Sequence, residues 1–228
     1  MRNQWLYADV ETTGVTQGSG VVEVAWILVD DYLVVHDKGH SIIDPEMPIP
    51  PESSAVHGLT SRDVVGAPTL DEYFSIVLGG IFSACDVIFC AYNSPFDYRF
   101  LHQYLPDWTP QMDLLRLARR IYPTAPNHKL STMVYFLDLN VDKGRFHSAD
   151  GDVSVLLDMT KRMSDDTGRS LYELFELANA PVEHLTMPFG KHLGLPLKDV
   201  PPHYVKWFMT KAENPDPDLV RAFKKLGY

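Results

Sequence analysis

The sequence contains 228 residues, of which 45% are hydrophobic, so it can bury a sizeable core and is not a disordered chain. Its formal net charge of −10 argues against a tight, non-specific nucleic-acid binder, because contacts to phosphates supply most of that affinity. The two cysteines, the absence of an apolar run of membrane-spanning length and the lack of a signal-peptide pattern favour a cytoplasmic protein without a disulfide framework.

Apolar runs bounded by turn residues predict strands, and apolar residues at helical spacing predict helices. We expect strands at 4–10, 21–30, 32–43 and 87–91, with an ordered loop rich in Pro, Ser and Gly at 44–69. We expect helices at 70–84, 96–104, 113–121, 130–137, 150–163 and 170–179. Strands first, then helices interleaved with one more strand, favour an α/β fold with helices packed on a mixed sheet.

The composition changes after Met163, where a polar stretch interrupts the pattern. This change predicts a main domain at 1–165, a helical linker at 166–183 and a small C-terminal module at 184–228. From Pro181 onward there are seven Lys and Arg against five Asp and Glu, so the module is positive while the remainder is strongly negative.

A pair of acids, Asp9 and Glu11, ends the first predicted strand and precedes Thr12-Thr13-Gly14. Alternation along a strand places both side chains on the same face. Two carboxylates held that close repel each other, and a hard cation such as Mg²⁺ relieves the repulsion with oxygen ligands. An ordinary acidic turn is the alternative interpretation of this motif alone.

Two further motifs stand at helix starts. Asn93 and Asp97 follow the strand at 87–91, and His147 and Asp152 flank the start of the helix at 150–163. Taken singly, each acid has an ordinary explanation as a helix cap or as a favourable charge at a helix N-terminus.

The order of these motifs, Asp-x-Glu, Asn-x-x-x-Asp and His-x-Ala-x-x-Asp, resembles the DEDDh family of 3′→5′ exonucleases over about residues 4–162. The stretches Val22–Ala25 and Val56–Thr60 resemble the family too. One departure is Tyr92, because many relatives have His before the Asn of the second motif.

The resemblance implies a ribonuclease H-like fold with a mixed five-stranded sheet, whose second strand is antiparallel, and catalysis with two Mg²⁺ or Mn²⁺ ions. Asp9, Glu11, Asp97 and Asp152 would be the metal-binding acids, and His147 would be the general base. The residues that we expect to contact the substrate are Thr12, Thr13, His57, Asn93, Phe96 and Lys191.

The C-terminal segment carries Phe189-Gly190-Lys191, Tyr204 and Trp207-Phe208. This pattern is similar to a C-terminal module found in one group of exodeoxyribonucleases within that family. Its lysines are candidates to contact phosphates. We expect the aromatic residues to form the module's own core rather than to stack on bases, because a small module needs its large apolar groups. The basic run at 116–120 is expected to be a solvated helix face.

We therefore expect an exodeoxyribonuclease that releases nucleoside monophosphates from DNA 3′ ends, single-stranded or duplex. An RNA exonuclease is the close alternative, because the same acids serve either phosphodiester and the 2′-hydroxyl decides between them. A non-catalytic nucleic-acid-binding or polymerase accessory protein on the same fold is the alternative from another class. We expect no membrane partner, and a homodimer is compatible with the sequence.

Overall fold

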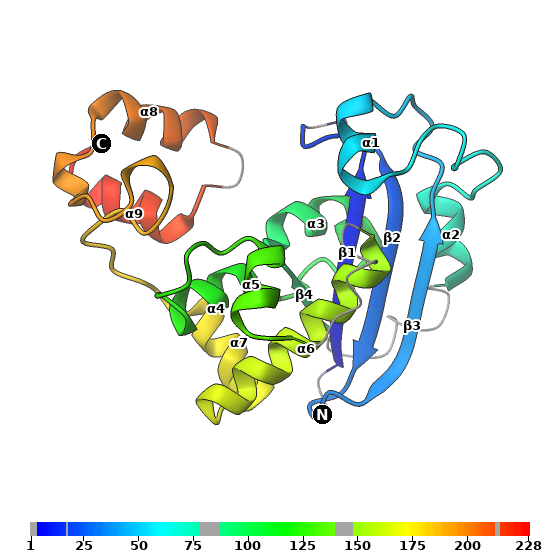
Figure 1. Ribbon diagram of the computed structural model, residues 1–228, viewed down its shortest axis with the longest axis horizontal. Coiled ribbons are helices and arrows are strands. Elements are labelled where there is room, and N and C mark those ends of the chain that lie inside the picture. The colour runs from blue at the N-terminus through cyan, green and yellow to red at the C-terminus, as the bar shows by residue number, and fades with distance from the viewer. Residues whose placement is uncertain (1–3, 17, 78–86, 140–147, 213–214) are drawn as a thin grey trace. The chain divides into compact units, whose positions relative to one another are not determined.

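The computed structural model describes residues 4–16, 18–77, 87–139, 148–212 and 215–228 of the chain (Figure 1). The chain divides into two compact units, Met1–Ala178 and Asn179–Tyr228, which are described separately. Over the described ranges, no helix is both long and apolar enough to cross a membrane.

The first unit is built on a five-stranded sheet in the order β3-β2-β1-β4-β5. Strand β2 runs antiparallel to both of its neighbours, whereas β1, β4 and β5 are parallel. The predicted mixed sheet with an antiparallel second strand is therefore confirmed. Its strands are β1 (Gln4–Thr12), β2 (Val21–Val29), β3 (Val35–Ile42), β4 (Val87–Ala91) and β5 (Gln111–Asp113).

Two strand predictions need correction. The third strand begins at Val35 rather than residue 32, because the Asp30 carboxylate accepts the backbone N–H groups of Tyr32 and Val34 and closes a turn. The three-residue β5 was not predicted, since it is too short to show alternation.

The first unit contains seven α-helices within the described residues. They are α1 (Pro51–His57), α2 (Leu70–Val77), α3 (Ser94–Leu101), α4 (Leu114–Ile121), α5 (Leu130–Phe136), α6 (Ala149–Thr167) and α7 (Leu171–Asn179), and the 3₁₀ turn η1 (His102–Tyr104) follows α3. The part of the predicted helix 70–84 beyond residue 77 lies outside the described residues.

Helix α1 lies inside the segment predicted to be a loop. It begins at Pro51, whose fixed φ suits a first helical position, and ends at Gly58, which adopts a positive φ of 79°. With only seven residues it shows no long apolar period. It carries the buried Ser53 and His57 one turn apart on the same face.

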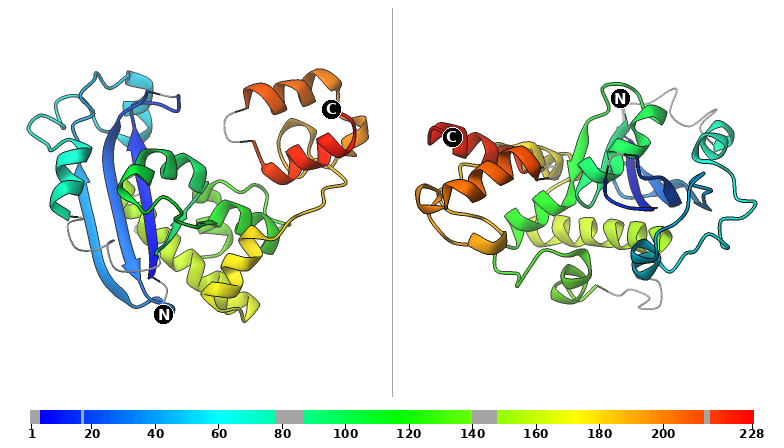
Figure 2. Two further views of the ribbon diagram at one scale, coloured as in Figure 1. Left: turned by 180° about the vertical axis from the view of Figure 1, so that it is seen from behind. Right: turned by 90° about the horizontal axis from the view of Figure 1, so that it is seen from above.

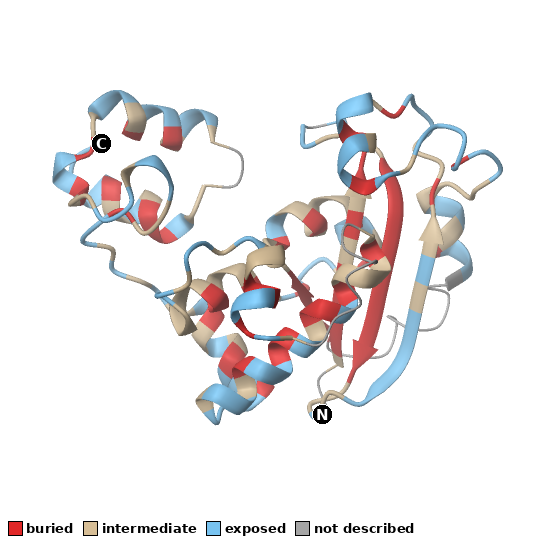
Figure 3. Cartoon of the chain, viewed as in Figure 1, coloured by how far each residue is buried: buried red, intermediate tan, exposed pale blue. Residues whose placement is uncertain are grey.

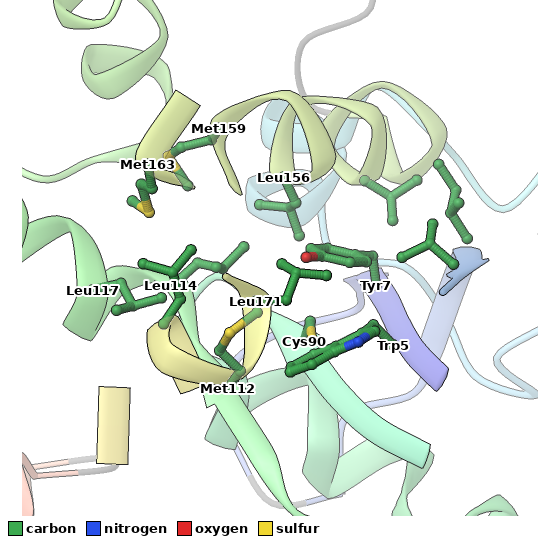
Figure 4. Close-up of a cluster of buried hydrophobic side chains, with 14 of the residues drawn as sticks. Trp5, Tyr7, Cys90, Met112, Leu114, Leu117, Leu156, Met159, Met163 and Leu171 are labelled. Carbon is green, nitrogen blue, oxygen red and sulfur yellow. The ribbon is translucent and has the colours of Figure 1, made fainter. Parts of the chain in front are cut away.

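The two faces of the sheet follow from alternation along β1. Trp5 and Tyr7 pack beneath α6 in one core, together with Cys90, Met112 and Leu156 (Figures 2 and 4). The alternate residues of β1, Leu6, Ala8 and Val10, face the other side of the sheet and pack with residues of α2 and α3. Asp9 and Glu11 continue the Trp5–Tyr7 face, so the sheet directs them toward the side covered by α6.

The boundary between the units follows Ala178 and therefore lies inside the predicted linker at 166–183, most of which belongs to the first unit. Helix α6 continues to Thr167, and α7 buries Leu171, Leu174 and Ala178 in the core of the first unit. These apolar contacts make α7 part of that unit.

The basic run at 116–120 is not a solvated face. Leu117 and Ala118 are fully buried, and Arg120 donates a hydrogen bond to the Leu177 carbonyl at the end of α7. The arginines therefore flank an apolar stripe that packs into the core.

The second unit is a small helical module with its own core. Its elements are η3 (Gly190–His192), η4 (Leu197–Asp199), α8 (Pro202–Lys211) and α9 (Pro217–Lys225). The core contains Met187, Leu197, Val200, Val205, Phe208, Leu219 and Phe223 (Figure 3). The expectation that the aromatic residues form this core holds for Phe208 but not for Trp207, which is 50% exposed.

Candidate metal and nucleic-acid site

Three carboxylates of the first unit converge at the end of β1. Asp9 and Glu11 lie two residues apart on the strand, and Asp152 comes from the first turns of α6. One ligand oxygen from each of the three lies within 4.8 Å of the other two. Asp152 lies more than 140 positions after Asp9 and Glu11 in the sequence, and the packing of α6 on the Trp5–Tyr7 face brings it to them.

The fourth predicted acid, Asp97, reaches the same place from the opposite side of the sheet. It lies in α3, which begins directly after β4, and is 2% exposed. Its Oδ1 accepts the backbone N–H of Val10 over 3.2 Å. Among the neighbouring charges, that of Asp97 raises the pKa of Asp9 the most. The carboxyl ends of the parallel strands β1 and β4 thus gather all four acids.

The acids raise one another's pKa. Burial, followed by the charges of Asp97, Asp152, Glu11 and Glu23, raises the pKa of Asp9 well above its usual range. Burial, then Asp152 and Glu23, raises the pKa of Glu11 to about 8. An all-oxygen set of crowded carboxylates fits hard divalent cations, whose charge offsets this repulsion.

A metal-free sample is expected to lose stability as the pH rises from about 4.5 to about 8. Glu11 keeps its proton in the folded state up to about 8, whereas the unfolded chain releases it near the ordinary value of 4.5. The unfolded state then binds fewer protons, so the free energy of unfolding falls across this window. Melting temperatures in chelator at several pH values would show it. The Glu11→Gln variant should have a flatter profile, and equal slopes would contradict the prediction.

Glu23 is a fifth carboxylate beside this cluster, and sequence reasoning gave it no role. It is 4% exposed and pairs in register with Glu11 across β1 and β2. Its Oε1 lies 2.7 Å from Nε2 of His40 on β3, and its Oε2 accepts the backbone N–H of Ala149 over 3.1 Å. Ala149 begins α6, so Glu23 ties the start of that helix, and with it Asp152, to the sheet. The available signal was an acid inside an otherwise apolar strand.

The turn after β1 is held by α1. Thr12 and Thr13 are buried, and the Ser53 hydroxyl donates to the Thr13 carbonyl over 2.8 Å. The neighbouring His57 accepts the Leu59 N–H at Nδ1, while its buried Nε2 has no hydrogen-bond partner among the described residues. Burial lowers the pKa of His57, and the nearby Glu23 charge and the Thr12 backbone oppose this effect. His57 therefore offers a ring nitrogen next to the turn that ends β1.

The second motif is held by another acid that sequence reasoning missed. Asn93 adopts a left-handed φ of 69° before α3, and its N–H donates to Oδ1 of Asp113 over 3.1 Å. The same oxygen caps α4 by accepting the N–H groups of Leu115 and Arg116. An Asp directly before an amphipathic run was the available signal for this cap.

Replacing Asp113 with Ala is expected to lower the free energy of unfolding by about 1–2 kcal/mol, since it removes a helix cap and the acceptor for Asn93. Asp113→Asn keeps an acceptor oxygen and should lose less. Urea denaturation of both variants measures the difference, and an unchanged midpoint for Asp113→Ala would contradict the assigned role.

Tyr92 and Phe96 are both held by protein contacts. The Tyr92 hydroxyl donates to the His128 carbonyl over 2.7 Å, so this departure from the family pattern serves packing rather than the acidic cluster. The Arg99 guanidinium lies 4.6 Å from the ring centroids of both Phe96 and Phe100, and it donates to the Val15 carbonyl. Phe96 thus lies beside the loop that follows β1.

Two predicted site residues remain. His147 is outside the described residues, so its role as general base stays a prediction. Lys191 is exposed and belongs to the second unit.

Comparison with known protein families gives two matches. A family model described as Exonuclease (RNase_T) matches residues 6–160. A second model, described as a putative quorum-sensing-regulated virulence factor, matches residues 174–226 and coincides with most of the second unit.

Among curated proteins, the chain is 27% identical to Exodeoxyribonuclease 10 of Escherichia coli (strain K12) over 224 residues, covering 95% of each protein. It is 27% identical to the DNA polymerase III subunit epsilon of Haemophilus influenzae, covering 71% of this chain and 68% of that protein.

Solved structures share the fold. Exonuclease X in complex with 5′ overhanging duplex DNA superposes with a TM-score of 0.60 at 22% identity, covering 78% of this chain and 99% of that one. The nuclease domain of 3′hExo, a DEDDh family member bound to rAMP, also gives a TM-score of 0.60, at 19% identity, with 72% and 93% covered.

Proposed function

This chain belongs to the exonuclease family whose model matches residues 6–160, and from that membership we propose that it removes nucleoside monophosphates from the 3′ ends of DNA with two divalent ions. The convergence of Asp9, Glu11 and Asp152 at the end of β1, with the charge of the buried Asp97 acting on Asp9, carries the proposal. The exonuclease activity expected from the sequence agrees with this membership.

The four acids would hold the cations, Mg²⁺ or Mn²⁺, beside the terminal phosphodiester. Bound there, the ions would stabilise the charge that develops on the attacking and leaving oxygens. Four other carboxylates raise the pKa of Asp9, and we assign it the central position in the cluster. Asp97, tied to the Val10 N–H, supports the side of the site next to β4.

The protein groups around the cluster would bind the last nucleotide and take up a proton. His147 would accept the proton of the attacking water, since imidazole titrates in the suitable range. Thr12 and Thr13, on the turn held by Ser53, and the buried Nε2 of His57 would contact the terminal nucleotide. Asn93 and Phe96 at the start of α3 would border it, and Lys191 would bind phosphate from the second unit.

DNA is favoured as the substrate because the likeness to an exodeoxyribonuclease extends over 95% of both proteins and therefore includes the second unit. RNA is the alternative, because the same acids act on either phosphodiester and a superposable relative is bound to rAMP. A non-catalytic accessory protein is less consistent with the site, since such a protein needs no four crowded carboxylates.

The test is a degradation assay with matched 20-nucleotide DNA and RNA strands, single-stranded and annealed, labelled at the 5′ end. With Mg²⁺ or Mn²⁺, we expect stepwise shortening from the 3′ end, faster on DNA, and none in chelator. Faster shortening of RNA would replace the DNA proposal by the RNA one. No shortening of any strand with either ion would contradict the nuclease assignment.

A further inference from the structure

Helix α8 of the second unit has one face that packs and one that does not. Val205 and Phe208 enter the module's core, and Phe208 is 4% exposed. Trp207, the residue before it, is 50% exposed although it is the largest side chain of the helix. Figure 3 shows the alternating buried and exposed stretches of α8. One exposed apolar side chain is ordinary by itself, so the case for a ligand depends on the groups that surround Trp207.

The exposed tryptophan belongs to a row of three rings. The Trp207 and Tyr204 ring centroids lie 5.4 Å apart at 43°, and His192 of η3 meets Tyr204 edge-on at 4.5 Å. Gly190 begins η3 with a positive φ of 77°, and a Cβ added there would lie 3.4 Å from the Tyr204 hydroxyl. Ordinary contacts of Gly190 and His192 with Tyr204 therefore place η3 against this face of α8.

Positive charge accompanies this row. Lys191 adjoins His192, and Lys211 lies four residues after Trp207 on the same face of α8. Within the described part of the second unit, neither lysine forms an ion pair. By contrast, Arg221 and Lys225 on α9 are paired with Asp218 and Glu183, which neutralises much of the unit's acidic charge.

We propose that His192, Tyr204, Trp207, Lys191 and Lys211, the α8 ring surface, bind single-stranded nucleic acid. Bases would stack on Trp207 and Tyr204, while the lysines contact phosphates. A duplex keeps its bases stacked inside, so the exposed Trp207 ring and the half-buried Tyr204 ring select unpaired strands. The proposal rests on the proposed function, because it assigns the second unit to the substrate of the same nuclease.

The test measures binding by the full chain in chelator, where no turnover occurs. Fluorescein-labelled dT20 is compared with an abasic strand of equal length, which carries the phosphates without the bases. We expect tighter binding of dT20 by the parent. Trp207→Leu, which keeps an apolar side chain but no ring, should lose at least about fivefold in affinity for dT20 and none for the abasic strand. Trp207→Phe should retain most of the affinity.

Two further variants separate rings from charges. Lys211→Ala should weaken binding of both strands and lower the salt slope of log Kd by about 0.7. Trp108→Ala, which removes a 79% exposed tryptophan from the first unit, should bind like the parent. Circular dichroism confirms that each variant is folded.

The proposal is overturned if Trp207→Leu binds dT20 as tightly as the parent. The exposed surface would then be assigned to binding a protein partner. It is also overturned if this variant loses affinity equally for the abasic strand. Mononucleotide release with Mg²⁺ is measured on the same preparations. Absence of mononucleotide release by the parent contradicts the proposed function. Unchanged dT20 binding by folded Trp207→Leu contradicts only the proposal for the α8 ring surface.

Discussion

Replacing Asp9 with Asn is expected to lower kcat by at least about 10³-fold, or about 4 kcal/mol in activation free energy, while raising the metal-free stability of the fold. Asp9 is surrounded by Asp97, Asp152, Glu11 and Glu23, whose charges raise its pKa. The amide keeps the shape of the side chain but removes the negative charge that holds a cation. It also removes a cost that the metal-free protein bears near neutral pH, where Asp9 must either hold a proton or carry its charge beside the other carboxylates.

Both effects can be measured on one preparation. Mononucleotide release at saturating Mg²⁺ gives kcat, and melting in chelator at pH 8 gives the stability. The matched control is Asp158→Asn, an exposed acid farther along α6, which should leave both quantities near the parent values. An Asp9→Asn enzyme with near-parent turnover would remove the basis of the assigned metal site. A lower metal-free melting temperature would contradict the repulsion argument alone.

Replacing Glu23 with Ala is expected to lower kcat by about 10- to 100-fold and to raise the Mg²⁺ concentration needed for half-maximal activity. Glu23 is a positioning residue, because its carboxylate ties the Ala149 N–H and the His40 ring to the same point of the sheet. Without it, the start of α6 loses the anchor that sets Asp152 beside Asp9. The buried N–H left without an acceptor also lowers the free energy of unfolding by about 1–3 kcal/mol.

The conservative variant separates positioning from charge. Glu23→Gln keeps an acceptor oxygen for Ala149, so stability and the Mg²⁺ midpoint should both return toward the parent values. A purely structural role would change stability and leave the Mg²⁺ midpoint where it is. If Glu23→Ala melts lower but needs no more Mg²⁺ than the parent, Glu23 does not position the metal-binding acids.

The sequence predictions were correct where a feature depends on neighbouring residues, and wrong where it depends on contacts between residues far apart in the chain. The apolar run of β2 and the alternation along β1 were readable because period and composition are local properties. Helix α1 and strand β5 were missed because seven and three residues are too few to show a period. The place of α7 was missed too, since only contacts with a distant core assign that helix to the first unit.

Composition also did not decide which individual side chains are buried and which are exposed. Trp207 and Phe208 are adjacent and both aromatic, and only the orientation of α8 leaves the first exposed and buries the second. The arginines at 116–120 appeared to be a solvated basic run until the packing of α4 placed Leu117 and Ala118 in the core and Arg120 against the end of α7.

The sequence by itself determined the chemistry of the site. Its four acids offer the oxygen ligands that a hard cation takes, and their order resembles that of the exonuclease family, so the sequence predicts a metal site of that type. Only the tertiary structure decided that β1, α3 and α6 bring these acids to one point, and that Glu23 and Asp113 hold the segments that carry them. The physical reason is that local patterns set the period and direction of side chains, whereas convergence and burial depend on contacts between residues far apart in the chain.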